Sequence, residues 1–500
     1  MVTPGQKPKE QTLLGMLDCP KQGAAARWAL VLAAAGAGLL QLVLSEVSWF
    51  FAVAVAVAST LGVVGIAVCS LRPRGITPAD MLAAALSMGY GLGTANTLVR
   101  SWIDGIDPLA QAYASPRSLA ETLGNVLLVV AALLVVGGLE KTRLMAFSHV
   151  PPARHRPIAW LAGLFVLMAF VMLATGQIGY QMNLSIEGGG GRISPTAATV
   201  IGALTPMAAL AAHCAFSAQR RYRVAFVVIV CATLVVMVTQ GRRLFLFSLL
   251  LCVMGYFSAG AKLPTLSLRS MIAVGAGVVA VQLAAKVFFA MRLASYDYST
   301  MPSLGELLSG AWEILVAGDK VGLQEQLSEN LRDRTFVLEY LAELLDKVKT
   351  HSPMYGEVLL MGLAFVIPSV FWSGKDRFIA LGAEESIVHP HLGMPDWDAA
   401  NTILTSGVSD FGMWGLFAYP IACALLFSLV VRLATRMDAA VRGVLGFSLA
   451  FSLLNVEATL SGPLVGLRSA VITGMLVYFA VVVVDRFGRA SRDTQAQGPL

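Results

Sequence analysis

The densest group of acid–base side chains lies between residues 375 and 401. It comprises Lys375-Asp-Arg377, Glu384-Glu385, His389-Pro-His391, Asp396-Trp-Asp398 and Asn401. Carboxylates and imidazoles are the groups that most often remove a proton from a hydroxyl nucleophile. Because the segment directly precedes a long apolar run, any of these carboxylates or histidines is a candidate general base close to a membrane surface.

A pair of arginines forms a second candidate site. Arg242 and Arg243 follow Thr239-Gln-Gly241 and lead directly into the apolar run Leu244–Leu251. A guanidinium is always charged and forms forked hydrogen bonds with phosphate or carboxylate oxygens. Two of them at the mouth of a helix suit a lipid-linked phosphate. The alternative is that both side chains snorkel to lipid head groups.

Two further arginines precede a predicted helix over Phe336–Val348. Arg332 and Arg334 lie just before it, and Arg334 shares a face with Val337 and Leu341, so that it borders the apolar stripe. The alternative is a salt bridge with one of the many acidic residues nearby.

The pattern of these residues predicts neither a metal nor a cofactor. His389-Pro-His391 and the two aspartates after it complete neither a helical histidine spacing nor a calcium loop. The short loops between apolar runs contain no Gly-rich phosphate loop, which argues against the use of a nucleotide.

The composition excludes a water-soluble globule. The 500 residues are 57% hydrophobic and only 13% charged, with a mean hydropathy of +0.72, whereas soluble domains contain about 25% charged residues. Much of the basic charge behind the net +6 lies in short loops, where it sets membrane topology, so a nucleic-acid partner is not predicted. The six cysteines form no CxxC pair, and the sequence therefore predicts neither a disulfide framework nor a zinc site.

We predict an all-α polytopic membrane protein with about 12 transmembrane helices. The predicted parts are an N-terminal bundle of about nine spans over 1–289, a long loop over 290–410, about three spans over 411–487 and a tail over 488–500. The apolar runs lie near 28–44, 49–69, 81–99, 119–139, 158–176, 197–217, 224–239, 244–258, 271–289, 411–433, 441–456 and 470–485.

The basic residues predict the orientation. On one side of the membrane the short loops hold few of them, namely Arg100, Arg117, Arg192, Arg242, Arg243 and Arg468. Both termini are therefore predicted to be cytoplasmic and the acidic long loop to face outward, with the first apolar run an uncleaved span and not a signal peptide. The spans have few acids at their centres, which counts against an ion-coupled transporter; Lys286 and His213 are their main ionisable groups.

The long loop itself contains three helical segments. Ser303–Val316 and Phe336–Val348 have the periodicity of amphipathic helices, which could lie on the membrane face or simply pack against other helices. The apolar run Val358–Trp372 is predicted to be re-entrant or buried, because a further crossing there would invert every later helix.

With these residues in view, the chain resembles the bacterial oligosaccharide repeat-unit polymerase (Wzy-type) and O-antigen ligase superfamily over about residues 239–420. Three places carry the resemblance: Gly241-Arg-Arg243; Arg334 with Leu344, Leu345 and Pro353-Met-Tyr-Gly356; and Asn401-Thr-Ile-Leu404 with Gly407, Asp410-Phe-Gly412 and Gly415. Ala400 stands where ligases have a histidine, which favours the polymerase.

The resemblance implies a metal-independent GT-C-like glycosyltransferase of the bacterial inner membrane. It would move a glycan at the periplasmic face from undecaprenyl pyrophosphate to the non-reducing end of another lipid-linked repeat unit. The alternatives are an O-antigen ligase and a flippase or exporter of lipid-linked sugars. The implied partners are the lipid-linked oligosaccharide, the bilayer, a chain-length regulator and a flippase.

In this family-based prediction, two arginines stabilise the leaving pyrophosphate and a residue of the acidic segment takes the proton. Arg243 and Arg334 are the leading arginines, with Arg242, Arg332, Arg377 and Asn401 as further binding residues. The candidates for the base are Asp398, His389 and His391.

Overall fold

The computed structural model describes residues 20–43, 76–95, 115–140, 142–144, 150–175, 177–178, 195–260, 279, 283, 286–291, 293–294, 304–317, 337–367, 371–379, 384–395, 401–455 and 458–496. Within these ranges the chain is helical, and its one β feature is an isolated antiparallel bridge between Ile76 and Leu144. The helices are α1 (Pro20–Val43), α3 (Pro78–Leu86), η2 (Ser87–Leu92), α5 (Pro116–Leu139), α6 (Pro152–Ala174), α8 (Pro195–Ser217), α9 (Arg220–Gln240), α10 (Arg242–Ser258), α12 (Leu304–Ala317), α14 (Val337–Lys347), α15 (Glu357–Val366), η4 (Ser373–Lys375), α16 (Asp376–Ile379), α17 (Glu385–Leu392), α18 (Ile403–Ala434), α19 (Ala439–Leu454) and α20 (Ser461–Ala496).

The described residues include six helices that are long and apolar enough to cross a membrane, so the protein is a helical membrane protein. These are α5, α6, α8, α9, α18 and α20, each at a predicted apolar run. Shorter apolar helices occur at Arg27–Leu39, Leu244–Ser258 and Ala439–Leu454. The predicted spans 49–69 and, for the most part, 271–289 lie outside the described residues, and a total of about 12 spans stays a prediction.

The described part of the run 81–99 is helical but is not one uninterrupted α-helix. α3 passes into the π-helix η2, which is followed by a short helical segment over 93–95. Thr77 caps the N-terminus of α3, and its hydroxyl accepts a hydrogen bond from the amide of Asp80. Such π-helical turns are rare and occur frequently at functional sites.

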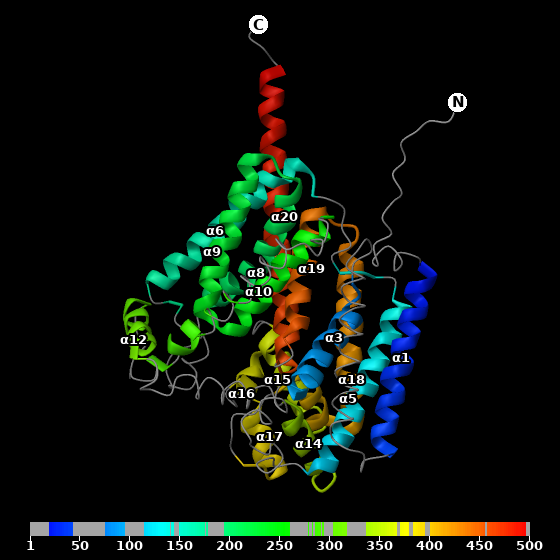
Figure 1. The fold of residues 1–500 in the computed structure, drawn as a ribbon. Helices are drawn as coiled ribbons and strands as arrows, with labels where there is room; N and C mark the ends of the chain where they lie inside the picture. The colour runs from blue at the N-terminus through cyan, green and yellow to red at the C-terminus, as the bar shows by residue number, and fades with distance from the viewer. Residues whose placement is uncertain are drawn as a thin grey trace, which may run out of the picture.

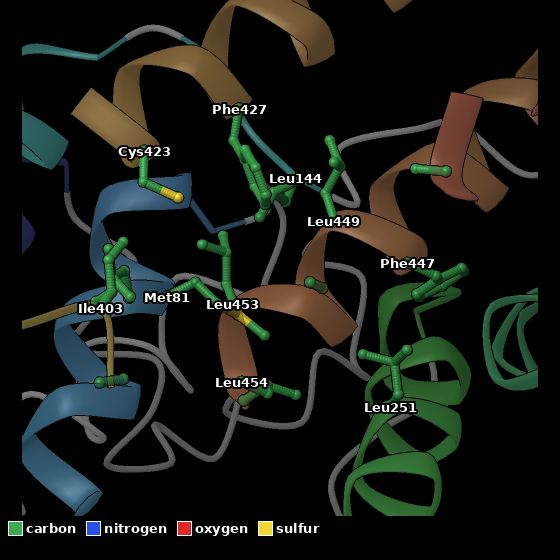
Figure 2. Close-up of a cluster of buried hydrophobic side chains, with 14 of the residues drawn as sticks. Met81, Leu144, Leu251, Ile403, Cys423, Phe427, Phe447, Leu449, Leu453 and Leu454 are labelled. Carbon is green, nitrogen blue, oxygen red and sulfur yellow. The ribbon is translucent and has the colours of Figure 1, made fainter. Parts of the chain in front are cut away.

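A bundle of long helices forms the body of the molecule, and α14, α15, α16 and α17 lie together at one end of it (Figure 1). α1 packs along α5, and α8 packs against α9, α10 and α19. The buried core connects α3, α10, α18 and α19, as Figure 2 shows for Met81, Leu251, Ile403, Cys423, Phe427, Phe447, Leu449, Leu453 and Leu454.

Helix α18 is broken where the sequence predicts the start of a span. Phe411 and Gly412 leave helical geometry, and Gly412 has φ +58° and ψ −137°, a conformation that L side chains rarely adopt. The eight residues before the break are all buried, and the rest of the helix follows it. Gly407 and Gly415 touch across the break so closely that a Cβ atom on either would overlap the carbonyl oxygen of the other.

The apolar run after Gly356 forms the short helix α15. Its 10 residues span about 15 Å, about half of the hydrocarbon thickness, so this helix does not cross a bilayer. At its C-terminal end, the Lys375 ammonium donates to the carbonyl of Ile367 at 2.7 Å and Arg468 donates to that of Phe365 at 2.8 Å. Cations at these carbonyls satisfy the helix end and oppose its dipole, as an apolar setting requires.

The two predicted amphipathic helices have different surroundings. Most residues of α14 are buried, and it packs against α5 and α18, so ordinary packing between helices is the correct interpretation there. α12 instead buries Leu307 and Ala311 and leaves Leu308, Trp312 and Val316 exposed.

Candidate functional site

α14 and α17 bring three acidic side chains together around a tyrosine and a histidine. The Tyr340 hydroxyl and Nε2 of His389 are hydrogen-bonded at 3.2 Å, and both side chains are buried. Burial, followed by the nearby Glu384, Glu385 and Glu343, raises the pKa of Tyr340. The phenol therefore stays protonated at neutral pH and serves as a hydrogen-bonding group.

Glu384 is the most deeply buried acid of this group. It precedes the first turn of α17, and its Oε2 accepts a hydrogen bond from the Ser406 hydroxyl of α18 at 2.8 Å. Burial, together with the like charges of Glu385 and Asp410, raises its pKa from 4.5 to about 8, although the Ser406 hydrogen bond acts in the opposite direction. The pair Glu384 and Glu385 therefore places a carboxyl that keeps its proton at neutral pH beside a second, half-buried carboxyl.

Glu384 is expected to make the stability of the protein depend on pH. Between about pH 4.5 and 8 the folded state holds a proton that the unfolded state releases, so the free energy of unfolding falls as pH rises through this window. Each unit of pKa difference corresponds to about 1.4 kcal/mol. The substitution Glu384→Gln mimics the protonated acid and should flatten this fall, measured by thermal unfolding in nanodiscs from pH 5 to 8.5. A variant with the wild-type pH slope would contradict the assignment.

Asn401 and the start of α18 form the other wall of the site. Nδ2 of Asn401 donates to Oε1 of Glu385. Thr402 caps α18 through a reciprocal pair of hydrogen bonds with Thr405, and its hydroxyl is also 2.7 Å from the hydroxyl of Tyr90 on η2. The N-terminus of α18, which directly follows Asn401, is thus fixed from both sides.

Among the described residues, three buried oxygens of the group have no hydrogen-bond partner. They are Oε1 of Glu384, Oδ1 of Asn401 and Oε2 of Glu343. Burial of an unpaired polar atom costs about 1–3 kcal/mol, so each such group in a folded protein calls for an explanation. Hydroxyl groups both donate and accept, so an occupant rich in them would satisfy the protonated Glu384 as well as the two acceptor oxygens. The site is therefore suited to a polyhydroxylated ligand.

Asp410 is buried next to this group but has a structural role. Its carboxylate accepts hydrogen bonds from the amides of Gly356, Val358 and Leu359 at 3.1, 3.0 and 2.8 Å, and from the Tyr419 hydroxyl. These amides begin α15, whose first N–H groups have no partner within the helix. Asp410 therefore holds α15 against α18 and is not available as a base.

The predicted site residues that the structure describes do not all meet. His389 and Asn401 line the acidic group, whereas His391 donates from Nε2 to the Ser352 carbonyl at 2.9 Å on the exposed side of α17. Arg377 is exposed and lies over the ring of Phe378.

Four further arginines and one aspartate of the prediction have no described side chain. Arg242 and Arg243 form the first turn of α10, but only their backbone is described; Arg332, Arg334 and Asp398 lie outside the described residues. In the part of the chain that is described, His, Cys, Asp and Glu side chains form no group of three suited to a metal ion.

The sequence pattern did not single out the two glutamates, although both lie in the acidic segment. It also missed Tyr340, Ser406 and Tyr90, because a hydroxyl in an apolar helix gives no signal by itself. The one usable hint was the adjacency of Glu384 and Glu385 within the polar segment 375–401. Comparisons with protein-family models, curated proteins and solved structures return no match.

Proposed function

We propose that this protein is a polymerase of lipid-linked oligosaccharide repeat units. The observation that carries the proposal is the hydrogen-bonded group where α18 begins, formed by the buried Glu384, Asn401 and Ser406 and the half-buried Glu385. Its oxygens can accept hydrogen bonds from sugar hydroxyls, and a carboxylate in it can accept a proton. Glycosyl transfer to a hydroxyl needs both.

We assign the general base to Glu385. It is half-buried and held by Asn401, whereas Glu384 is buried and keeps its own proton near neutral pH. In the reaction, the acceptor hydroxyl oxygen attacks the anomeric carbon of the donor glycan as its proton passes to Glu385. The bond from that carbon to the pyrophosphate breaks, and undecaprenyl pyrophosphate leaves with the bonding electrons.

The leaving group gains negative charge, so cationic donors must stabilise it. Arg243 is the leading candidate, because it lies in the first turn of α10, where the helix dipole also favours an anion. Arg334 is the second; it lies three residues before Val337, with which α14 begins. Further candidates for stabilising the leaving pyrophosphate are Arg242, Arg332 and Arg377.

The proposed setting is the outer face of the bacterial inner membrane, in a GT-C-like fold of about 12 spans. The distribution of basic residues supports this orientation. It is also supported by α20, which begins beside α15 and extends to the end of the bundle far from α14 and α17 (Figure 1). A flippase would supply the substrate and a chain-length regulator would act on the product.

Deletion of the gene in its own host tests the proposal, with lipid-linked and surface glycans resolved by size. A polymerase defect leaves single repeat units that are exported but not lengthened. Complementation with Glu385→Gln should reproduce the defect, while Glu357→Gln, the same change at an exposed acid of α15, should restore full chains.

Other outcomes would identify another function. Full-length chains that remain on the carrier and do not reach their final acceptor would indicate a ligase. Repeat units held on the cytoplasmic leaflet would indicate a transporter, and the roles assigned to Glu385 and the arginines would then fall.

A further inference from the structure

An exposed aromatic surface surrounds the break in α18. It is formed by Tyr355, Phe411, Met413 and Trp414, and we call it the break surface. All four side chains are exposed, Trp414 to 86%. The backbone holds them together: the amide of Tyr355 donates to the carbonyl of Asp410 at 2.9 Å, so residue 355 lies beside the start of the break.

The conformation of Tyr355 is unusual. It is the one non-glycine residue with positive φ, +51°, in the described part of the chain, and Gly356 follows with φ +100°. A left-handed conformation at a bulky residue is strained and persists where the surroundings impose it, commonly at functional positions. Here the amides of Gly356 and Val358 donate to the Asp410 carboxylate and fix the turn, in which the Tyr355 side chain is exposed.

The break surface lies close to the proposed transfer site along a rigid element. The eight residues Ile403–Asp410 connect Asn401 and Thr402, at the site, to Phe411, and a helix of this length is about 12 Å long. The first part of α18 is buried on all sides, so this spacing does not depend on a mobile segment.

We propose that the break surface binds the polyisoprenoid chain of the lipid carrier; this rests on the function proposed above. A lipid-linked sugar has its glycan, pyrophosphate and apolar chain in a fixed order, so a glycan at Asn401 places the chain beyond the pyrophosphate, toward the membrane. Broad aromatic rings offer a large apolar contact at low conformational cost. Ordinary lipid tails would also contact this surface, and the experiment separates them from the carrier.

The test measures elongation kinetics with the full-length protein in nanodiscs, using two donors that differ only in their isoprenoid chain: one of native length and one of two isoprene units. Trp414→Ala should raise KM for the long-chain donor about tenfold, an effect of ~1.4 kcal/mol, and leave kcat and the short-chain KM unchanged. The matched control is Trp160→Ala on α6, whose indole is 73% exposed and far from α18 in sequence. The Trp160→Ala substitution should leave KM unchanged for both donors.

A photoreactive benzophenone amino acid at position 414 provides a second readout. We expect adducts with the long-chain donor that excess unlabelled polyisoprenyl pyrophosphate suppresses. Adducts with phospholipid alone, or an equal effect of Trp414→Ala on both donors, would overturn the inference while wild-type elongation still supported the function. If the wild-type protein elongates neither donor, both proposals fail.

Discussion

Replacement of Arg243 by alanine is expected to stop chain lengthening while the protein stays folded in the membrane. Loss of one preorganised donor to a developing negative charge typically lowers a rate by about 10²–10³-fold. The position supports so large an effect, because Arg243 lies in the first turn of α10, directly after Gly241, whose φ of +134° reverses the chain from α9. Elongation by purified protein and the size ladder of glycans in the complemented host would measure it.

Lysine at the same position tests the chemistry. It keeps the charge but cannot form the forked contact of a guanidinium, so Arg243→Lys should recover only a small part of the rate. Arg334→Ala should show the same loss as Arg243→Ala. The control is Arg117→Ala on α5: this arginine, on the same predicted side, is 71% exposed and pairs with Glu121 at 2.9 Å. Wild-type chain lengths in both Arg243→Ala and Arg334→Ala would remove the pyrophosphate-binding role.

Hydropathy predicted the spans well where one apolar run forms one helix. The run 119–139 corresponds to α5, which begins at Pro116 after the N-cap Ser115 and ends at Leu139. Its prediction needs only an unbroken apolar stretch and a proline at the first turn. Hydropathy did not predict the π-helical turn in the run 81–99, where α3 and η2 share one apolar stretch, because it carries no information on backbone hydrogen-bond spacing.

The break in α18 shows the same limit. Gly407, Gly412 and Gly415 were noted as part of a motif, but the sequence placed the start of the span at 411. The structure begins the helix at Ile403 and breaks it at Gly412. A glycine in an apolar run is compatible with both a continuous and a broken helix, and here the carboxylate of Asp410, engaged with the amides of α15, accompanies the break.

The sequence predicted which segment contains the candidate site, but not which side chains meet there. The polar run 375–401 stood out against an apolar chain, and it contains His389, Asn401 and both glutamates. Which of its residues turn inward depends on contacts with helices far away in sequence. Tyr340 lies on α14 and Tyr90 on η2, and both are fixed by packing that no local pattern specifies.

The substitution with the largest expected effect on stability lies at the end of the bundle opposite the candidate site. There Arg27 of α1 binds Asp80 of α3. Nη1 donates to Oδ1 and Nη2 to Oδ2, both at 2.7 Å, and Nη1 also donates to the carbonyl of Leu134 at 3.0 Å. Asp80 is completely buried, and Arg143 approaches its Oδ2 at 3.9 Å. No sequence pattern predicted this pair, because Asp80 precedes an apolar run and resembles an ordinary acid at the start of a helix.

Replacement of Arg27 by methionine should lower the free energy of unfolding by about 3–5 kcal/mol, because it leaves a buried carboxylate without its forked partner. Equilibrium unfolding in mixed micelles would measure this. The double variant Arg27→Met with Asp80→Asn should recover part of the loss, since the uncompensated charge is then gone. Arg117→Met is the control: its exposed ion pair should contribute about 1 kcal/mol or less. An equal effect of Arg27→Met and Arg117→Met would mean that Arg143 alone compensates Asp80, and that the α1–α3 ion pair does not hold the bundle together.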